Sequence, residues 1–130
     1  MRPRAWLAPL VITAALLAGC SGGSDAITDV DVSAAQQIVD DGNAVILDVR
    51  TPEEFAAGHL PGAININVES SDFATKVAGL DESTETLVYC RTGNRSGVAT
   101  DTMADLGFTD MSDLQGGIEA WAAAGEQVVR

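Results

Sequence analysis

Two short apolar runs restrict the fold of this chain more than any other feature. Residues 44–47 (Ala-Val-Ile-Leu) and 86–89 (Thr-Leu-Val-Tyr) have the length of strands and do not alternate with polar residues. Strands of this kind are buried on both faces, as in parallel sheets that helices cover from both sides. Helical patterns alternate with the strand patterns along the chain. We therefore expect a small α/β domain with a mainly parallel β-sheet flanked by helices.

Capping residues mark where the helices begin and end. Ser33 and Gln36 form a capping-box pattern that predicts a helix start, and Gly42 follows its end. Thr51 and Pro52 predict the start of a second helix, which Gly58 ends. The remaining predicted elements are strands over 63–66 and 111–114 and helices over 72–78, 96–106 and 118–124. The helix over 96–106 is expected to bury one apolar face: Val98, Ala99, Met103 and Leu106.

The first nineteen residues have the layout of a secretory signal peptide. Arg2 and Arg4 precede an almost wholly apolar stretch over 5–17. That stretch is shorter than the about 20 residues that a transmembrane helix needs. Residues 1–19 are therefore predicted to be removed from the mature protein, and an uncleaved membrane span is the alternative.

The end of this stretch resembles the bacterial lipobox. Residues 17–20 read Leu-Ala-Gly-Cys, and the resemblance implies that Cys20 is lipidated and becomes the mature N-terminus. Acyl chains on Cys20 would hold the protein at a membrane surface. We expect an extracytoplasmic, membrane-anchored lipoprotein in which 20–28 is a flexible tether and 29–130 is one folded domain.

Charge and cysteine content narrow the possible functions. A chain that begins at Cys20 has five Lys and Arg against nineteen Asp and Glu, a formal charge of −14. This acidity argues against nucleic acid and anionic headgroups as partners. With Cys20 lipidated, Cys90 is the only thiol of an exported protein. An unpaired thiol of this kind is either reactive or buried and inert.

The neighbours of Cys90 favour a reactive thiol. Cys90 follows the strand over 86–89 and precedes a helix, at the end of the sheet where open α/β folds bind ligands. The loop over 90–95 has no proline, and Gly93 permits a positive φ. Its N–H groups can turn inward and form an anion nest at a helix N-terminus. Such surroundings lower a cysteine pKa from about 8.5 to roughly 3.5–7.5.

Cationic side chains are concentrated near this loop. Arg91 and Arg95 belong to it, and Arg50 ends the strand that precedes the second helix. Together they are three of the five cations in the chain from Cys20 onward, which suggests an anionic substrate. The alternative is a buried structural Cys90, which leaves the two loop arginines unexplained.

Three segments, in this order, resemble the rhodanese family of sulfurtransferases. The upstream segment comprises 47–50 (Leu-Asp-Val-Arg), 54–55 and 58–65; the middle one is the loop over 90–95 with Ser96; the downstream one comprises 106–108, 114–118 and Trp121. The resemblance runs from about Val32 to Trp121. It implies a single-domain rhodanese in which Cys90 takes a sulfane sulfur as a persulfide and passes it to a nucleophilic acceptor.

Roles follow from combining the resemblance with the chemistry of the loop. The Cys90 thiolate is expected to attack an anionic donor such as thiosulfate, and a thiol or cyanide accepts the sulfur. The expected substrate-binding residues are those of the loop: Arg91, Thr92, Gly93, Asn94, Arg95 and Ser96. Around them, we expect Asp48 to accept N–H bonds from the loop and Arg50 to pair with Glu54. We expect a monomer and no cofactor.

Other readings of the sequence remain open. The chain can be a sulfur carrier, or a binding module that presents a persulfide without turnover. Phosphatases and arsenate reductases also have rhodanese-like folds, but phosphatase loops have five residues between cysteine and arginine, and here there are four. His59, the only histidine, is expected to be structural, and it has too few partners for a metal site. Trp121 and Phe108 are expected in the core.

Overall fold

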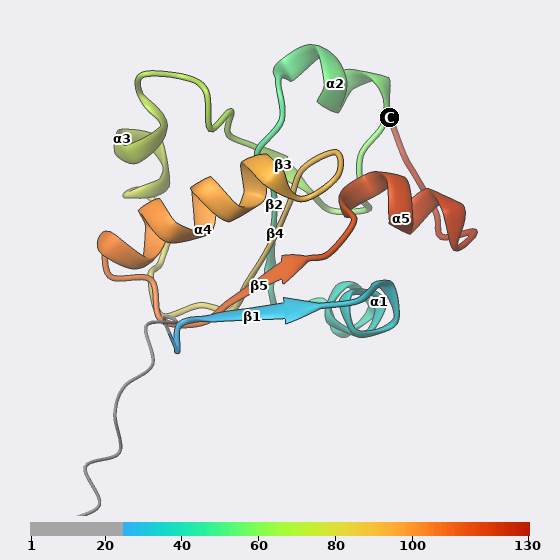
Figure 1. Ribbon diagram of the computed structural model, residues 1–130, viewed down its shortest axis with the longest axis horizontal. Coiled ribbons are helices and arrows are strands. Elements are labelled where there is room, and N and C mark those ends of the chain that lie inside the picture. Colours follow the sequence, from blue (N-terminus) through green and yellow to red (C-terminus); the bar gives the residue numbers. More distant parts are fainter. Residues whose placement is uncertain (1–24) are drawn as a thin grey trace, which may run out of the picture.

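The computed structural model describes residues 25–130, so the predicted signal peptide, lipobox and Cys20 lie outside the described residues. Five strands alternate with five helices (Figure 1). The strands are β1 (Ile27–Val30), β2 (Val45–Asp48), β3 (Ile64–Asn65), β4 (Thr86–Tyr89) and β5 (Met111–Leu114). The helices are α1 (Val32–Asp41), α2 (Pro52–Ala57), α3 (Phe73–Val77), α4 (Asn94–Asp105) and α5 (Gly117–Ala123).

All five strands form one parallel sheet in the order β1-β5-β4-β2-β3. The buried strand β4 lies at its centre, between β5 and β2. Parallel neighbours need crossover connections, which the helices supply. The α/β class and the parallel sheet expected from the sequence are confirmed.

The helices cover both faces of the sheet (Figure 1). Because strand side chains alternate between faces, Leu47 and Val88 pack with α3 and α4, whereas Ile46 and Leu87 pack with α1 and α5. Trp121 and Phe108 are both buried, as expected. Cys90 continues the alternation of β4 and lies on the side of α3 and α4.

Some predicted boundaries were wrong. Helix α1 begins two residues earlier than predicted. Asp31, and not Ser33, is the N-cap, and its side chain accepts from Ala34 N over 2.9 Å. On α4, the buried positions are Ser96, Ala99, Thr100 and Met103. Val98 and Leu106 were predicted to be buried there, but they are 60% and 40% exposed. The small hydroxyl residues Ser96 and Thr100 fit between α4 and the sheet. A prediction from apolar residues alone therefore chose a face of α4 that is partly exposed.

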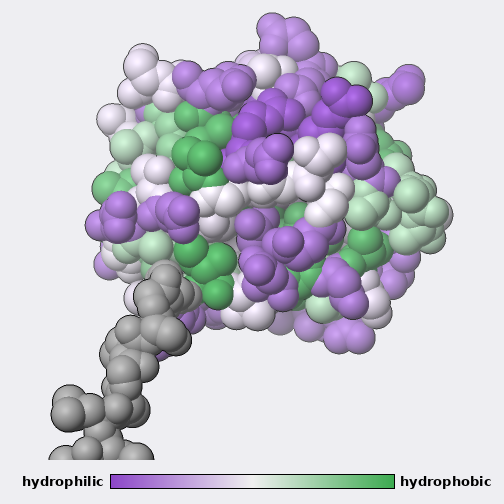
Figure 2. Space-filling view, in the orientation of Figure 1, coloured by the Kyte–Doolittle hydropathy of each residue, from purple (hydrophilic) through white to green (hydrophobic). Residues whose placement is uncertain are grey.

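The position of strand β1 shows that the predicted tether is too long at its C-terminal end. Ile27 and Thr28 pair with Met111 and Ser112 of β5, so the flexible segment expected over 20–28 cannot extend to Thr28. The polar residues of this edge strand made it look like a linker. Within residues 25–130, no helix is long and apolar enough to cross a membrane. Figure 2 shows hydrophilic residues over much of one face, with small hydrophobic patches between them.

Candidate active site

The loop after β4 curls around the sulfur of Cys90. The Gly93 N–H donates to Cys90 Sγ over 3.0 Å, and the Cys90 thiol donates to Ser96 Oγ over 3.6 Å. Gly93 has φ +123°, a backbone conformation that residues with a side chain rarely adopt. Helix α4 begins immediately afterwards, at Asn94. The predicted inward-facing loop at a helix N-terminus is therefore present.

This arrangement favours the thiolate. Cys90 is only 1% exposed, and burial by itself raises the pKa of its thiol. Hydrogen bonds from the backbone and hydroxyl of Ser96, and from the backbones of Gly93 and Thr92, have the larger combined effect. They hold the pKa of Cys90 below its ordinary value. The sulfur is the one group of the loop with stabilised negative charge and nucleophilic chemistry.

The N-terminus of α5 binds the backbone of the loop through two hydrogen bonds. Ile118 N donates to Cys90 O over 2.9 Å, and Glu119 N donates to Arg91 O over 3.2 Å. A Cβ at Gly117 would lie 2.4 Å from Arg91 O and 2.5 Å from Cys90 O, so only glycine fits there. The turn at Gly116 and Gly117 therefore allows the backbone of α5 to lie close to the backbone of the loop.

Both loop arginines are paired with carboxylates. Arg95 forms a bidentate pair with Glu54 of α2, with Nη1–Oε1 at 2.7 Å and Nη2–Oε2 at 2.9 Å. The side chain of Arg91 is 66% exposed and its Nε lies 2.8 Å from Glu119 Oε1. A donor that contacts either guanidinium must compete with these carboxylates. The pair with Arg95 holds the pKa of Glu54 at about 2.

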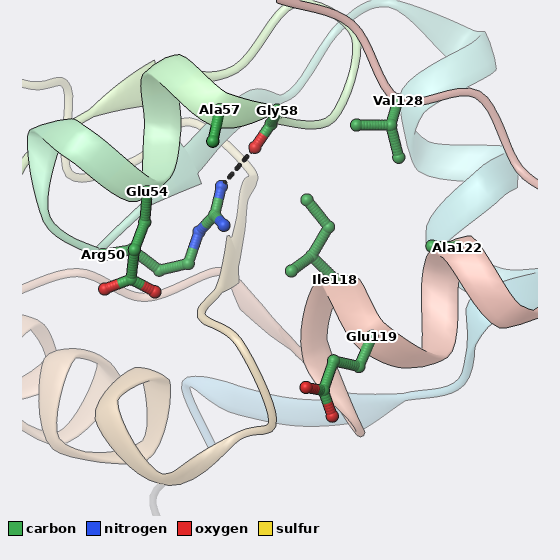
Figure 3. Close-up of a pocket in the computed structure, with 8 residues that line it drawn as sticks. All are labelled: Arg50, Glu54, Ala57, Gly58, Ile118, Glu119, Ala122 and Val128. Atoms are coloured by element: carbon green, nitrogen blue, oxygen red, sulfur yellow. Dashed lines mark hydrogen bonds between the residues drawn. The ribbon is translucent and has the colours of Figure 1, made fainter.

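Asp48 and Arg50 do not make the contacts expected of them. Asp48 accepts from Arg50 at both carboxylate oxygens, with Nη2–Oδ2 at 2.6 Å, and from the Tyr89 hydroxyl over 2.7 Å. Arg50 therefore pairs with Asp48 and not with Glu54, and its Nη2 also donates to Gly58 O over 2.6 Å (Figure 3). Asp48 lies on the face of the sheet opposite Cys90, since the register pairs it with Tyr89. From that face its carboxylate makes no hydrogen bond with the loop.

A cavity of about 270 Å³ lies between α2 and α5 (Figure 3). The polar part of its lining is Arg50, Glu54 and Glu119, and the rest is Ala57, Gly58, Ile118, Ala122 and Val128. Cys90 is not among these residues. The cavity adjoins the loop through Glu119, the partner of Arg91, and through Glu54, the partner of Arg95.

Comparison with known proteins shows the family of this chain. Residues 31–124 match the rhodanese-like domain family. The chain belongs to the rhodanese-like family. It is 40% identical over 89 residues to thiosulfate sulfurtransferase 16, chloroplastic, of Arabidopsis thaliana, covering 61% of this chain and 74% of that protein. It is 40% identical over 81 residues to thiosulfate sulfurtransferase GlpE of Pseudomonas putida, covering 62% of this chain and 71% of the relative.

A solved structure shows the same fold. The crystal structure of a rhodanese-related protein from Thermoplasma volcanium superimposes with a TM-score of 0.69 at 30% identity, covering 78% of this chain and 96% of that one. The family match and this superposition both cover the segment that contains the Cys90 loop.

His59 has a structural position in this rhodanese-like domain. Its ring stacks on Phe55 with centroids 3.8 Å apart, and its Nδ1 lies 2.9 Å from Phe55 O. Its backbone pairs with Val129 near the C-terminus. These contacts fix the end of α2. None of them involves Cys90.

Four residues around the loop were missed by the sequence analysis. They are Tyr89, Asp113, Gly117 and Glu119. Tyr89 and Asp113 belong to strand patterns and looked like core and strand residues, respectively. Glu119 gave no signal, since its partner Arg91 is 28 positions away. Gly117 belongs to the downstream segment over 114–118, but its contact with the loop depends on the packing of α5.

Proposed function

We propose that this protein is a thiosulfate-type sulfurtransferase that carries a persulfide on Cys90. The observation that supports it most is the hydrogen-bonded sulfur at the base of the loop, with Gly93 N 3.0 Å away and a lowered thiol pKa. A sulfurtransferase needs a stable anion in the loop in both states: the charge lies on Sγ in the thiolate and on the outer sulfur in the persulfide. Backbone N–H groups of the loop can stabilise both.

The reaction is a double displacement. The Cys90 thiolate attacks the outer sulfur of thiosulfate, the sulfur–sulfur bond of the donor breaks, and sulfite leaves with the bonding electron pair. The acceptor, cyanide or a thiolate, then attacks the outer sulfur of the persulfide. Its attack returns the electron pair to Cys90 and regenerates the thiolate. No step requires a cofactor.

We propose that the loop arginines act mainly by holding the loop. Arg95 joins it to α2 through Glu54, and Arg91 joins it to α5 through Glu119. The backbone N–H groups of Thr92, Gly93 and Ser96 then donate hydrogen bonds to the negatively charged sulfur. Asn94 stands at the start of α4, where its exposed side chain can reach a donor. An effect of Arg95 on donor capture requires that the donor displace Glu54.

We also propose that the protein works in the cell envelope, anchored through a lipid on Cys20. The support is the lipobox-like sequence of residues 17–20. Cys20→Ala should release the protein into the soluble fraction and leave its kinetic constants for soluble substrates unchanged. Continued membrane association of this variant would contradict lipid anchoring.

A steady-state assay with thiosulfate and cyanide tests the reaction. Wild-type protein should form thiocyanate, and Cys90→Ser should reduce turnover to background. Cys20→Ala is the matched control, since it removes the other cysteine and should keep full turnover. A wild-type protein without turnover that still accepts a persulfide would instead be a sulfur carrier. Turnover in Cys90→Ser would exclude Cys90 from the mechanism.

A further inference from the structure

Asp113 of β5 is a buried acid that the sulfur-transfer reaction does not use. It is 5% exposed. Because strand side chains alternate between faces, it lies on the same face as Met111, which is the face that α4 covers. Within residues 25–130, its Oδ1 is the only buried side-chain nitrogen or oxygen atom without a hydrogen-bond partner. Buried polar groups nearly always have a partner, so an exception at this depth needs a reason.

The groups that face Asp113 come from two elements, β1 and α4. Asp29 of β1 lies opposite it in the sheet register, and Asp101 and Ser96 belong to α4. Burial first, then the negative charges of Asp29 and Asp101, raise the pKa of Asp113. A hydrogen bond with the Ser96 hydroxyl acts in the opposite direction. The carboxyl therefore keeps its proton to a higher pH than an exposed aspartate does.

Ser96 connects this carboxyl with the sulfur. It is fully buried, and its Oγ lies 3.0 Å from Gly93 O and 3.6 Å from Cys90 Sγ. A serine hydroxyl has one proton to donate. Once Cys90 is a thiolate it can only accept, so Sγ, Gly93 O and an ionised Asp113 compete for the same proton.

We propose that Asp113 is a positioning residue for the Ser96 hydroxyl and that its protonation state decides whether that hydroxyl donates to Cys90. When Asp113 is ionised, the Ser96 proton turns toward the carboxylate. When Asp113 takes up one proton from solvent, it donates that proton to Ser96 Oγ. The Ser96 hydroxyl is then free to donate to the thiolate or persulfide. The chain Asp113–Ser96–Cys90 thus makes the loop a better anion site when the carboxyl is protonated than when it is ionised.

The inference deepens the proposed function, because it concerns the same sulfur, but it is tested without turnover. The probe is the rate of Cys90 alkylation by iodoacetamide against pH, which reports the thiolate midpoint. Asp113→Asn keeps the shape and supplies an amide N–H that donates to Ser96 permanently. Its midpoint should lie about one pH unit below wild type, a tenfold gain in thiolate fraction below the midpoint.

Two control variants separate the mechanism from a general charge effect. In a Ser96→Ala background, Asp113→Asn should shift the midpoint by less than about a third of that amount, because the connecting hydroxyl is gone. Asp101→Asn removes one charge from the same helix without touching Ser96 and should give a smaller shift than Asp113→Asn. An unchanged midpoint in Asp113→Asn, or an equal shift in the Ser96→Ala background, would overturn the proposal.

A measurement on the wild-type sequence covers the case in which Asp113→Asn fails to fold. Coupling between two sites is reciprocal. Alkylation of Cys90 removes the thiolate, so the carboxyl carbon of Asp113, followed by NMR, should titrate at a lower pH than in the unmodified protein. Identical titration of the two forms would contradict the coupling. A protein that lacks sulfurtransferase turnover but shows both shifts would disprove the proposed function and leave this inference in place.

Discussion

Two buried carboxylates, Asp48 and Asp113, lie on opposite faces of the sheet, and they differ in their hydrogen-bond partners. Asp48 accepts from the backbone N, Nε and Nη2 of Arg50 and from the Tyr89 hydroxyl, so its charge is fully compensated. Asp113 has one oxygen without a partner and two acidic neighbours. The first is part of a network that links β2, β4 and the turn at Gly58. Within the described residues, the second has no cation beside it, and burial and its acidic neighbours favour its protonated form. A buried acid beside a reactive loop can therefore be scaffold or switch, and its partners distinguish the two.

The largest expected effect is the loss of the compensated carboxylate. Asp48→Asn leaves the buried Arg50 guanidinium without its counter-charge, and it should destabilise the fold by about 3–5 kcal/mol. Urea unfolding followed by circular dichroism measures this. A loss below about 1 kcal/mol would mean that the Asp48–Arg50 pair does not hold the structure.

The half-buried pair between the loop and α2 should contribute less. Glu54→Gln should cost on the order of 1 kcal/mol at neutral pH, because solvent screens a partly exposed pair. The folded-state pKa of Glu54 is about 2, below its ordinary 4.5. Its stabilising contribution is therefore complete above pH 4.5 and is lost as the pH falls toward 2. The difference between wild type and Glu54→Gln should vanish over that range, and a difference independent of pH would contradict the pairing.

The contribution of Asp113 to stability should change with pH in the opposite direction to that of Glu54. Its folded-state pKa is raised above 3.8, so folding favours its protonated form. The stability contributed by that form is complete below pH 3.8 and declines as the pH rises through the raised pKa. Asp113→Asn does not titrate, so its stability relative to wild type should improve from acid to neutral pH, within about 1 kcal/mol. Unfolding curves at several pH values measure this, and a trend like that of Glu54 would contradict the contrast.

The smallest effect is expected at the exposed pair. Arg91 and Glu119 are both more than half exposed, so Glu119→Gln should change the free energy of unfolding by less than about 0.5 kcal/mol. A larger loss would show that this pair, and not the backbone contacts of Gly117 and Ile118, fixes the loop against α5.

Local patterns predicted much of this molecule. The strands over 86–89 and 111–114 and the helix start at Thr51 and Pro52 are where the sequence placed them, because burial and capping are local properties. The position of the Cys90 loop followed from the strand before it and the helix after it.

What the sequence did not predict depends on contacts between distant segments. Arg95 was assigned to the donor, but Glu54, 41 positions away, lies within reach of both its nitrogens. Arg50 had two acidic candidates, and only the register of β2 with β4 brings Asp48 and Tyr89 to the same side as its guanidinium. Asp113 looked like any polar residue of a short strand. Its burial depends on how α4 packs over β5.

The central claim is that Cys90 carries the transferred sulfur. The direct measurement is the intact mass of purified protein after a brief exposure to thiosulfate, followed by addition of cyanide. The wild type and Cys20→Ala should gain the mass of one sulfur atom and lose it when cyanide is added, whereas Cys90→Ser should gain nothing. A sulfur adduct of equal yield on Cys90→Ser, or no adduct on the wild type, would contradict the account.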